Sequence, residues 1–182
     1  MCIVIDAQAL LESYPNPSQN AAEPTDITGN TQDYVYVLIS GGSEVRPVVG
    51  TTGGADMTLT LALELDQIVS WGATPMAPTR NDALLVDFEL LPTQNPLNRA
   101  LFESVQQCTL VVDQNQPNDE RMPALVFQTY MASQWQCQCI GEGDGVCAFT
   151  IAVIEPGTEA TAHVAGYFQW RVPLFIVPTS KP

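Results

Sequence analysis

The sequence is poor in basic residues and contains one histidine, His163. Six Lys and Arg residues stand against twenty Asp and Glu residues, which gives a net charge of −14 over 182 residues. Proteins bind nucleic acids and anionic membranes through clustered Lys and Arg side chains. The basic residues of this chain are isolated from one another, so we expect neither nucleic acid nor a membrane as a partner.

Long apolar runs are also missing. A bilayer-spanning helix needs about 18 or more apolar residues in a row, and runs such as 83–86 and 173–177 are far shorter. The first apolar residues follow no basic stretch and are interrupted by Asp6, which is not the pattern of a secretory signal. We therefore expect a cytoplasmic protein. The hydrophobic content of 46% is ordinary for a folded globule, and we expect one domain over 1–182.

Helical periodicity is nearly absent as well. Short apolar runs alternate with segments rich in Pro, Gly, Asn and Asp, which is typical of an all-β sandwich or barrel. One short helix is expected over 7–13, because good helix formers there precede Pro15. Strands are expected at 2–6, 34–39, 57–63, 68–72, 83–91, 108–113, 146–154 and 164–177, the last broken at Pro173. The segment 124–139 is long enough for one bent strand or for a hairpin. We predict a single antiparallel β-sandwich, jelly-roll-like, of roughly eight to ten strands, with a loop over 14–32.

Catalytic residues are not evident. General-base and nucleophilic catalysis usually require a proton carrier beside the reacting group, and histidine is the commonest. The sequence contains neither the Gly-x-Ser-x-Gly motif nor a Cys-His signature. We expect His163 at a strand edge or on the surface, and we predict no enzyme activity, catalytic residue or cofactor.

The five cysteines are an odd number for a disulfide framework, and free thiols are the simplest interpretation. Cys137, Cys139 and Cys147 together with His163 match a zinc site in number, but the first two are closer in sequence than zinc ligands usually are. A disulfide from Cys137 or Cys139 to Cys147 across a hairpin is a third interpretation. The sequence leaves these alternatives open.

Acidic loops are the other candidate metal ligands. Glu142 and Asp144 lie in a glycine-rich turn, and calcium prefers oxygen ligands of this kind. Neither this turn nor 113–120 completes an EF-hand pattern, so we expect solvated acidic loops and predict no metal site. Glu142 and Asp144 remain weak calcium candidates.

Aromatic residues mark a candidate interface near the C-terminus, where Tyr, Trp and Arg, which are enriched at interfaces, occur together. The predicted interface or ligand face consists of Tyr167, Phe168, Trp170 and Arg171. With Trp71 and Trp135, these rings could instead stack on a sugar. A carbohydrate-binding module at a host interface is therefore the alternative function.

Three sets of short motifs follow one another along the chain. The first comprises 4–11 (Val-Ile-Asp-Ala-Gln-Ala-Leu-Leu), 14–20 (Tyr-Pro-Asn-Pro-Ser-Gln-Asn) and 24–27 (Pro-Thr-Asp-Ile). The second comprises 59–63 and 66–71, and the third comprises Tyr130, 166–170 (Gly-Tyr-Phe-Gln-Trp) and 173–176 (Pro-Leu-Phe-Ile). In this order they resemble the AidA/PixA family of bacterial inclusion-body proteins over nearly the whole chain.

The resemblance implies a cytoplasmic β-sandwich protein linked to stationary phase, quorum sensing or host association, some of whose relatives form crystalline intracellular inclusions. It supplies no catalytic residues. We therefore predict a non-enzymatic protein that associates with itself, at least as a dimer, in intracellular inclusions. Because like-charged chains repel, such assembly must use low-charge apolar or aromatic faces, cations, or a pH near the isoelectric point.

Overall fold

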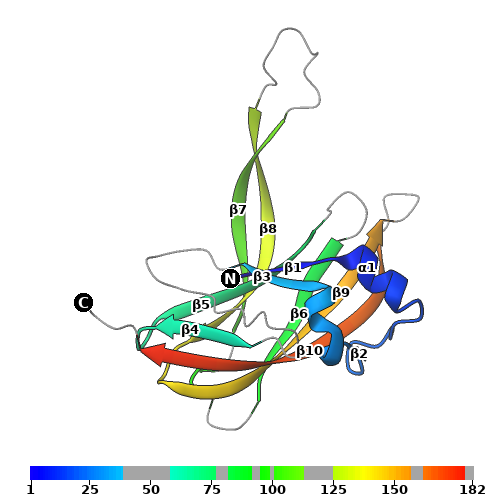
Figure 1. The fold of residues 1–182 in the computed structure, drawn as a ribbon. Coiled ribbons are helices and arrows are strands. Elements are labelled where there is room, and N and C mark those ends of the chain that lie inside the picture. The colour runs from blue at the N-terminus through cyan, green and yellow to red at the C-terminus, as the bar shows by residue number, and fades with distance from the viewer. Residues whose placement is uncertain are drawn as a thin grey trace.

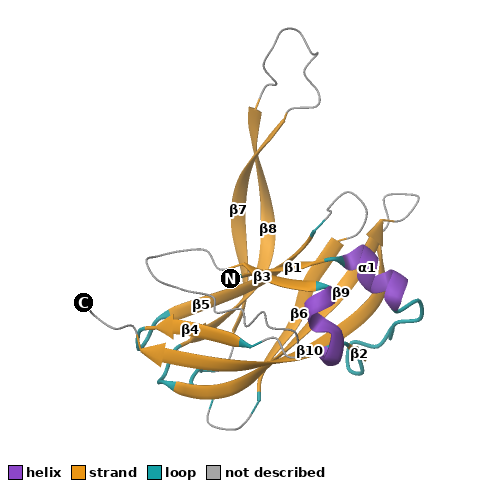
Figure 2. Cartoon of the chain, in the orientation of Figure 1, coloured by secondary structure: helices purple, strands orange, loops and turns teal. Residues whose placement is uncertain are grey.

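The structure is a computed structural model that describes residues 1–38, 58–76, 82–91, 95–98, 101–112, 125–156 and 162–178, with backbone alone over 101–112 and 125–133. Within these residues, two sheets form the molecule (Figures 1 and 2). The first sheet has the strand order β3-β1-β5-β8-β7, and the second has the order β2-β10-β9-β6 with β4 also paired to β10. The predicted all-β fold is confirmed.

Ten strands and two short helices are described, and they are numbered in chain order. The first sheet contains β1 (Cys2–Ile5), β3 (Val35–Leu38), β5 (Ile68–Pro75), β7 (Leu101–Val112) and β8 (Leu125–Gln138). The second sheet contains β2 (Thr25–Asp26), β4 (Leu59–Leu63), β6 (Asp82–Leu90), β9 (Gly143–Pro156) and β10 (Ala162–Pro178). The helices are α1 (Ala7–Ser13) and the 3-10 helix η1 (Thr28–Asp33).

The sheets are mixed, which corrects the prediction of a purely antiparallel sandwich. β1 runs parallel to β5, and β10 runs parallel to both β2 and β4. Side-chain alternation shows which residues share a face of a strand, but it carries no information about the direction of the neighbouring strand. The direction had to come from the structure.

The short helix α1 is confirmed. Asp6 precedes it and accepts a hydrogen bond from the Ala9 backbone nitrogen at 3.0 Å, which satisfies one of the free N–H groups of the first turn. The helix buries Ala7 and Leu10. The region 14–32, predicted as a loop, also contains β2 and the start of η1. These elements are too short and polar to produce a periodic pattern.

The core between the sheets is rich in aromatic rings. Trp71 of β5 lies 5.1 Å, between ring centroids, from Phe149 of β9, and Phe149 lies 5.5 Å from Trp170 of β10. Phe88 of β6 stacks on Trp71 at 5.4 Å. Burial of large aromatic rings contributes strongly to stability. This cluster therefore joins the first sheet, through Trp71, to the second.

Strand β10 is continuous through Pro173, where we predicted a break. The Arg171 backbone nitrogen donates to Thr28 Oγ1 at 3.2 Å, on the side of β10 away from β9. Backbone groups two residues apart face the same side of a strand. The position of Pro173 thus faces away from β9, between the pairing with β2, which ends at Gln169, and that with β4, which begins at Leu174. The missing N–H group removes no hydrogen bond to β9.

Strands β7 and β8 extend beyond the sandwich. β8 pairs with β5 only over Trp135–Gln138, whereas its pairing with β7 continues to Val112 opposite Leu125. Residues 103–112 and 125–134 therefore form a two-stranded extension, here called the β7–β8 ribbon, which rises away from both sheets (Figure 1). The prediction had placed a strand only at 108–113 and had left a hairpin open for 124–139, which is one strand.

Candidate functional site

The four residues predicted to form an interface do not share a surface. Phe168 and Trp170 are 0% exposed and belong to the core, whereas Arg171 is exposed and Tyr167 is half-buried on the outer face of β10. Successive side chains of a strand point to opposite faces. The interface prediction is therefore wrong for Phe168 and Trp170. Trp71 is also fully buried, so neither Trp71 nor Trp170 can stack on a sugar.

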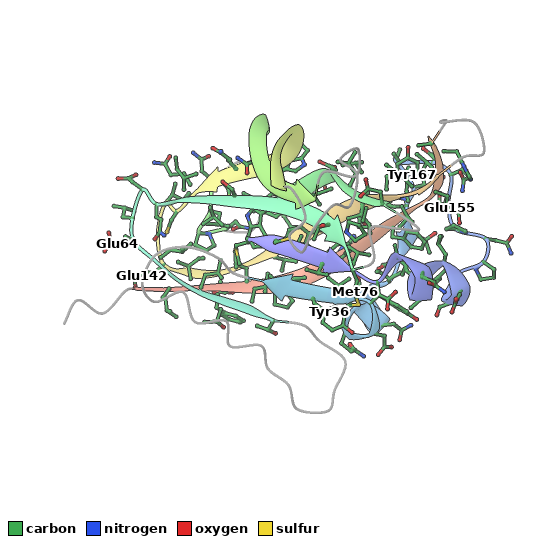
Figure 3. The ribbon with its side chains drawn as sticks, turned by 90° about the horizontal axis from the view of Figure 1, so that it is seen from above. Tyr36, Glu64, Met76, Glu142, Glu155 and Tyr167 are labelled. Atoms are coloured by element: carbon green, nitrogen blue, oxygen red, sulfur yellow. The ribbon has the colours of Figure 1, made fainter. Side chains whose placement is uncertain are left out.

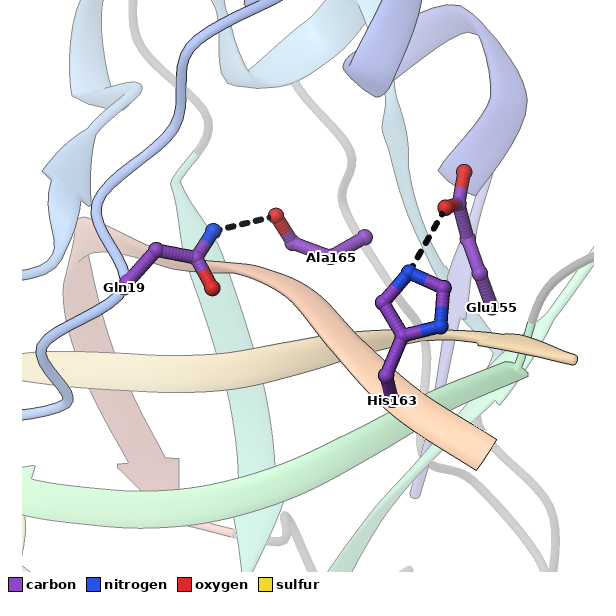
Figure 4. Close-up of polar contacts among 4 residues, drawn as sticks. All are labelled: Gln19, Glu155, His163 and Ala165. Carbon is purple, nitrogen blue, oxygen red and sulfur yellow. Dashed lines mark hydrogen bonds and ion pairs between the residues drawn. The ribbon is translucent and has the colours of Figure 1, made fainter. Parts of the chain in front are cut away.

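His163 lies on the surface, as predicted. Its Nε2 atom lies 3.2 Å from Glu155 Oε2 on the neighbouring strand, with the two side chains 63% and 41% exposed (Figure 4). Exposed ion pairs of this kind contribute little to stability, because water screens them. The pair is a surface contact between β9 and β10.

Two of the motifs shared with the family are in contact here. The Tyr167 nitrogen donates to the Ser18 carbonyl at 2.8 Å, and Gln19 Nε2 donates to the Ala165 carbonyl at 2.6 Å (Figure 4). A Cβ atom at Gly166 would lie 2.4 Å from Pro17 Cγ. Glycine is required there because the ring of Pro17 occupies the space of a side chain. The segment 14–20 is thus fastened to the start of β10.

The cysteines are buried thiols. Cys137, Cys139 and Cys147 are free and buried, and Trp71 Nε1 donates to Cys137 Sγ at 3.3 Å. Burial raises the pKa of Cys137 to about 11 and also raises the pKa of Cys147. A protonated thiol is a poor nucleophile for disulfide exchange. No disulfide joins these three cysteines, which agrees with the interpretation as free thiols.

The weak calcium candidates Glu142 and Asp144 are both exposed, near the turn from β8 to β9. Among the residues that the structure describes, no group of three or more His, Cys, Asp or Glu side chains is arranged to hold a metal ion. The turn thus offers two solvated carboxylates.

Charge is distributed unequally between the sheets. The strands of the first sheet contain one charged side chain, Glu103, in a chain whose net charge is −14. The strands of the second sheet carry Arg171 and six carboxylates: Asp26, Asp82, Asp87, Glu89, Asp144 and Glu155. Figure 3 looks down on the first sheet, with Glu64 and Glu142 at one end of the sandwich and Glu155 at the other.

The outer face of the first sheet is therefore uncharged along β1, β3, β5 and the part of β8 that pairs with β5, and Glu103 of β7 lies beyond this area at the base of the ribbon. Ile3, Ile5, Val69 and Trp71 point into the core, so the residues between them face outward. We call this surface the uncharged face; it consists of Cys2, Val4, Tyr36, Ile68, Ser70, Gly72, Thr74, Gln136 and Gln138.

Exposed apolar side chains lie on and beside this face. Tyr36 is 45% exposed and Ile68 is 63% exposed. Met76, which is 49% exposed, follows β5 and donates its backbone N–H to the Ile5 carbonyl. Tyr36 on β3 is the cross-strand partner of Val4, and Met76 follows β5 on the other side of β1. Figure 3 shows both residues near the same end of β1. The arrangement suits contact with a low-charge surface.

The charged groups near the face lie at its margin or are partly buried. At the margin, Gln138 Nε2 donates to Asp66 Oδ1 at 3.0 Å. The Met1 ammonium group donates to the Ser70 carbonyl, and burial lowers its pKa. Sequence reasoning missed the uncharged face, although a signal was present: 67–79 and 122–141 contain no charged residue.

A family model described as PixA, inclusion body protein, matches residues 1–176. A crystal structure of the inclusion body protein PixA from Burkholderia cenocepacia J2315 is similar, with a TM-score of 0.72 and 19% sequence identity, covering 97% of this chain and 93% of that chain. At this identity the likeness concerns the fold. No curated protein matches the sequence.

No helix among the described residues has the length and apolar character to cross a membrane.

Proposed function

The chain belongs to the PixA family of inclusion body proteins, and from this premise we propose that it is a non-enzymatic protein that assembles with copies of itself into inclusions in the cytoplasm. The observation that carries the proposal is the uncharged face of the first sheet. The production in stationary phase or under quorum sensing that the resemblance implies belongs to the same proposal.

Self-association of this chain has an electrostatic cost. Two molecules with a charge of −14 repel each other, and burial of an unpaired carboxylate in a contact costs further free energy. Cores of protein interfaces are accordingly depleted in charged residues. The uncharged face lets two copies approach without bringing carboxylates together, whereas the outer face of the second sheet does not.

The chemistry of the described side chains supports a role without catalysis. The Cys137 thiol, with its raised pKa, is protonated at neutral pH and is a poor nucleophile. His163 is exposed beside Glu155 and away from these buried thiols. Among the described side chains, the reactive residue types are therefore not gathered into one site.

A matched pair of charge insertions tests the proposal. Ile68→Glu places a carboxylate on the uncharged face, and Leu84→Glu, at a position 39% exposed on β6, places one on the second sheet. We expect Ile68→Glu to raise the concentration needed for assembly by about tenfold, equivalent to about 1.4 kcal/mol, and Leu84→Glu to change it little. Sedimentation velocity and electron microscopy of expressing cells measure this. A strictly monomeric parent protein that forms no inclusions would refute the proposal.

A further inference from the structure

Among the residues that the structure describes, no second layer lies against the β7–β8 ribbon. Ten cross-strand pairs, from Glu103 opposite Gln134 to Val112 opposite Leu125, extend beyond the last pair that β8 makes with β5, at Trp135. No described helix or strand lies across the outer half of the ribbon (Figure 1). An isolated two-stranded hairpin is at best marginally stable in water. The ribbon therefore needs a cover.

The register identifies which face of the ribbon needs it. Trp135 packs against the core, and the pairing of β7 with β8 shows no shift from there to the tip. Every second pair therefore falls on the side that continues the core side of the first sheet. These pairs include Gln106–Met131, Cys108–Thr129, Leu110–Phe127 and Val112–Leu125. We call this the core-side face of the ribbon; its outer half is apolar by sequence.

We propose that the cover is the ribbon of a second copy of this chain, and that two ribbons pack through their core-side faces about a twofold axis. The inference rests on the proposed self-association and names one of its contacts. A twofold axis brings the same surface of two copies together, so each apolar face meets an identical apolar face. The pairing forms a small two-layer sandwich from two hairpins that each lack a second layer.

Charge favours a second copy as the partner. Glu103 at the base is the one charged residue in the ribbon. Ten residues of strand extend about 33 Å at about 3.3 Å each, whereas the Debye length is about 8 Å at physiological ionic strength. Ribbons packed with opposite directions therefore hold the two acidic bodies farther apart than the range of their repulsion. A direct contact between the two sandwiches would bring their net negative charges within the range of this repulsion.

The size of the contact predicts its strength. A ribbon face of about 33 Å by about 10 Å offers roughly 300 Å² per chain, compared with about 800 Å² per partner in a standard stable interface. The dimer should therefore be weak and form at high protein concentration. A twofold contact also closes after two copies, so growth into inclusions requires another contact, for which the uncharged face is available.

Two neighbouring residues provide a matched test in the full-length protein. Phe127→Glu places a charge on the core-side face of the ribbon, and Gln128→Glu places the same charge on the opposite face. Sedimentation velocity over a concentration series should show the dimer dissociation constant raised at least tenfold by Phe127→Glu and changed less than about twofold by Gln128→Glu. Phe127→Ser, which adds no charge, should weaken the dimer in the same direction, and near-ultraviolet circular dichroism should show a native core in all three variants.

The outcomes separate this inference from the proposed function. If the parent protein associates and both Phe127 variants behave like Gln128→Glu, the ribbon contact is refuted while self-association stands. If the parent protein is monomeric at every concentration, both are refuted. A selective loss of the dimer in the Phe127 variants, with assembly still sensitive to Ile68→Glu, supports both.

Discussion

The two sheets of this molecule share one core but differ in the length of their strands and in the charge on their outer faces. The second sheet contains the long strands β9 and β10, paired from Ala162 opposite Pro156 to Ile176 opposite Gly143. The first sheet has short strands β1 and β3 and a four-residue pairing between β5 and β8. Behind them, both sheets bury apolar residues in one core. On its outer face the second sheet carries several charged side chains, whereas the strands of the first sheet carry only Glu103, at the base of the ribbon.

This difference separates stability from association. On the outer face of the second sheet, Ala148 of β9 lies between Arg171 and Glu89 of its neighbours, so charged groups border the small residues of the central strand. The exposed side chains of Glu89 and Arg171 cover this part of the face, and the carboxylates of the second sheet oppose contact with another acidic molecule. The first sheet presents uncharged side chains and extends into the ribbon. We infer that the second sheet mainly stabilises the fold, while the first sheet forms the contacts between copies.

The largest effect expected is on the stability side of this comparison. Trp170→Ala removes a fully buried ring that stacks on Phe149, and such truncations cost about 3–5 kcal/mol. Tyr36→Ala, at a position 45% exposed on the first sheet, should change the free energy of unfolding by less than about 1 kcal/mol. Denaturant unfolding monitored by circular dichroism measures both. Equal losses would contradict the assignment of Trp170 to the core and of Tyr36 to an outer face.

A smaller effect should appear at alkaline pH, where the buried thiols are tested. Burial raises the pKa of Cys137 from 9.0 to about 11, so the folded state holds this proton more tightly than the unfolded state. The associated stability is complete below about pH 9 and is lost as the pH rises towards 11, by on the order of 2 kcal/mol. Unfolding free energies measured from pH 7 to 11 for the parent and for Cys137→Ala should show a shallower decline in the variant. Parallel curves would show that this thiol does not titrate in the unfolding equilibrium.

The smallest of these effects concerns the contact between the N-terminal loop and β10. Gly166→Ala places a methyl group 2.4 Å from Pro17 Cγ, so the backbone of one segment must move. We expect a loss of about 1–2 kcal/mol without a change in self-association, because the site is on the second sheet. Gly141→Ala is a control, since no atom lies within 4 Å of a Cβ built there. A melting temperature lowered equally in both variants would rule out the clash with Pro17 as the cause.

The sequence predicted the parts of the fold that depend on local pattern. Alternation over 57–63 predicts that Met57, Leu59, Leu61 and Leu63 share one face of a strand. The three leucines are buried, and Met57 lies outside the described residues. The helix over 7–13 followed from composition and Pro15. The same alternation would have separated Phe168 and Trp170 from Tyr167 and Arg171, but we grouped them by residue type. Their burial shows that position on the strand, not enrichment at interfaces, decides the face.

Other features depend on contacts between distant segments. The parallel pairing of β1 with β5, the departure of the ribbon from the sandwich and the charge difference between the sheets require knowledge of which strands are neighbours. The charge-free stretches 67–79 and 122–141 were visible in the sequence, but only strand order brings β5 and β8 together in one sheet. The candidate site is therefore a property of topology.

Hydrogen exchange compared between assembled and dilute protein tests the central claim most directly. If the first sheet and its ribbon form the contacts between copies, amides of 103–112 and 125–134 should exchange at least tenfold more slowly in the assembled protein, because a hairpin that opens easily becomes covered. Amides of β6, on the charged sheet, should exchange at the same rate in both states. Slower exchange in β6 and β10 with an unchanged ribbon would contradict the account.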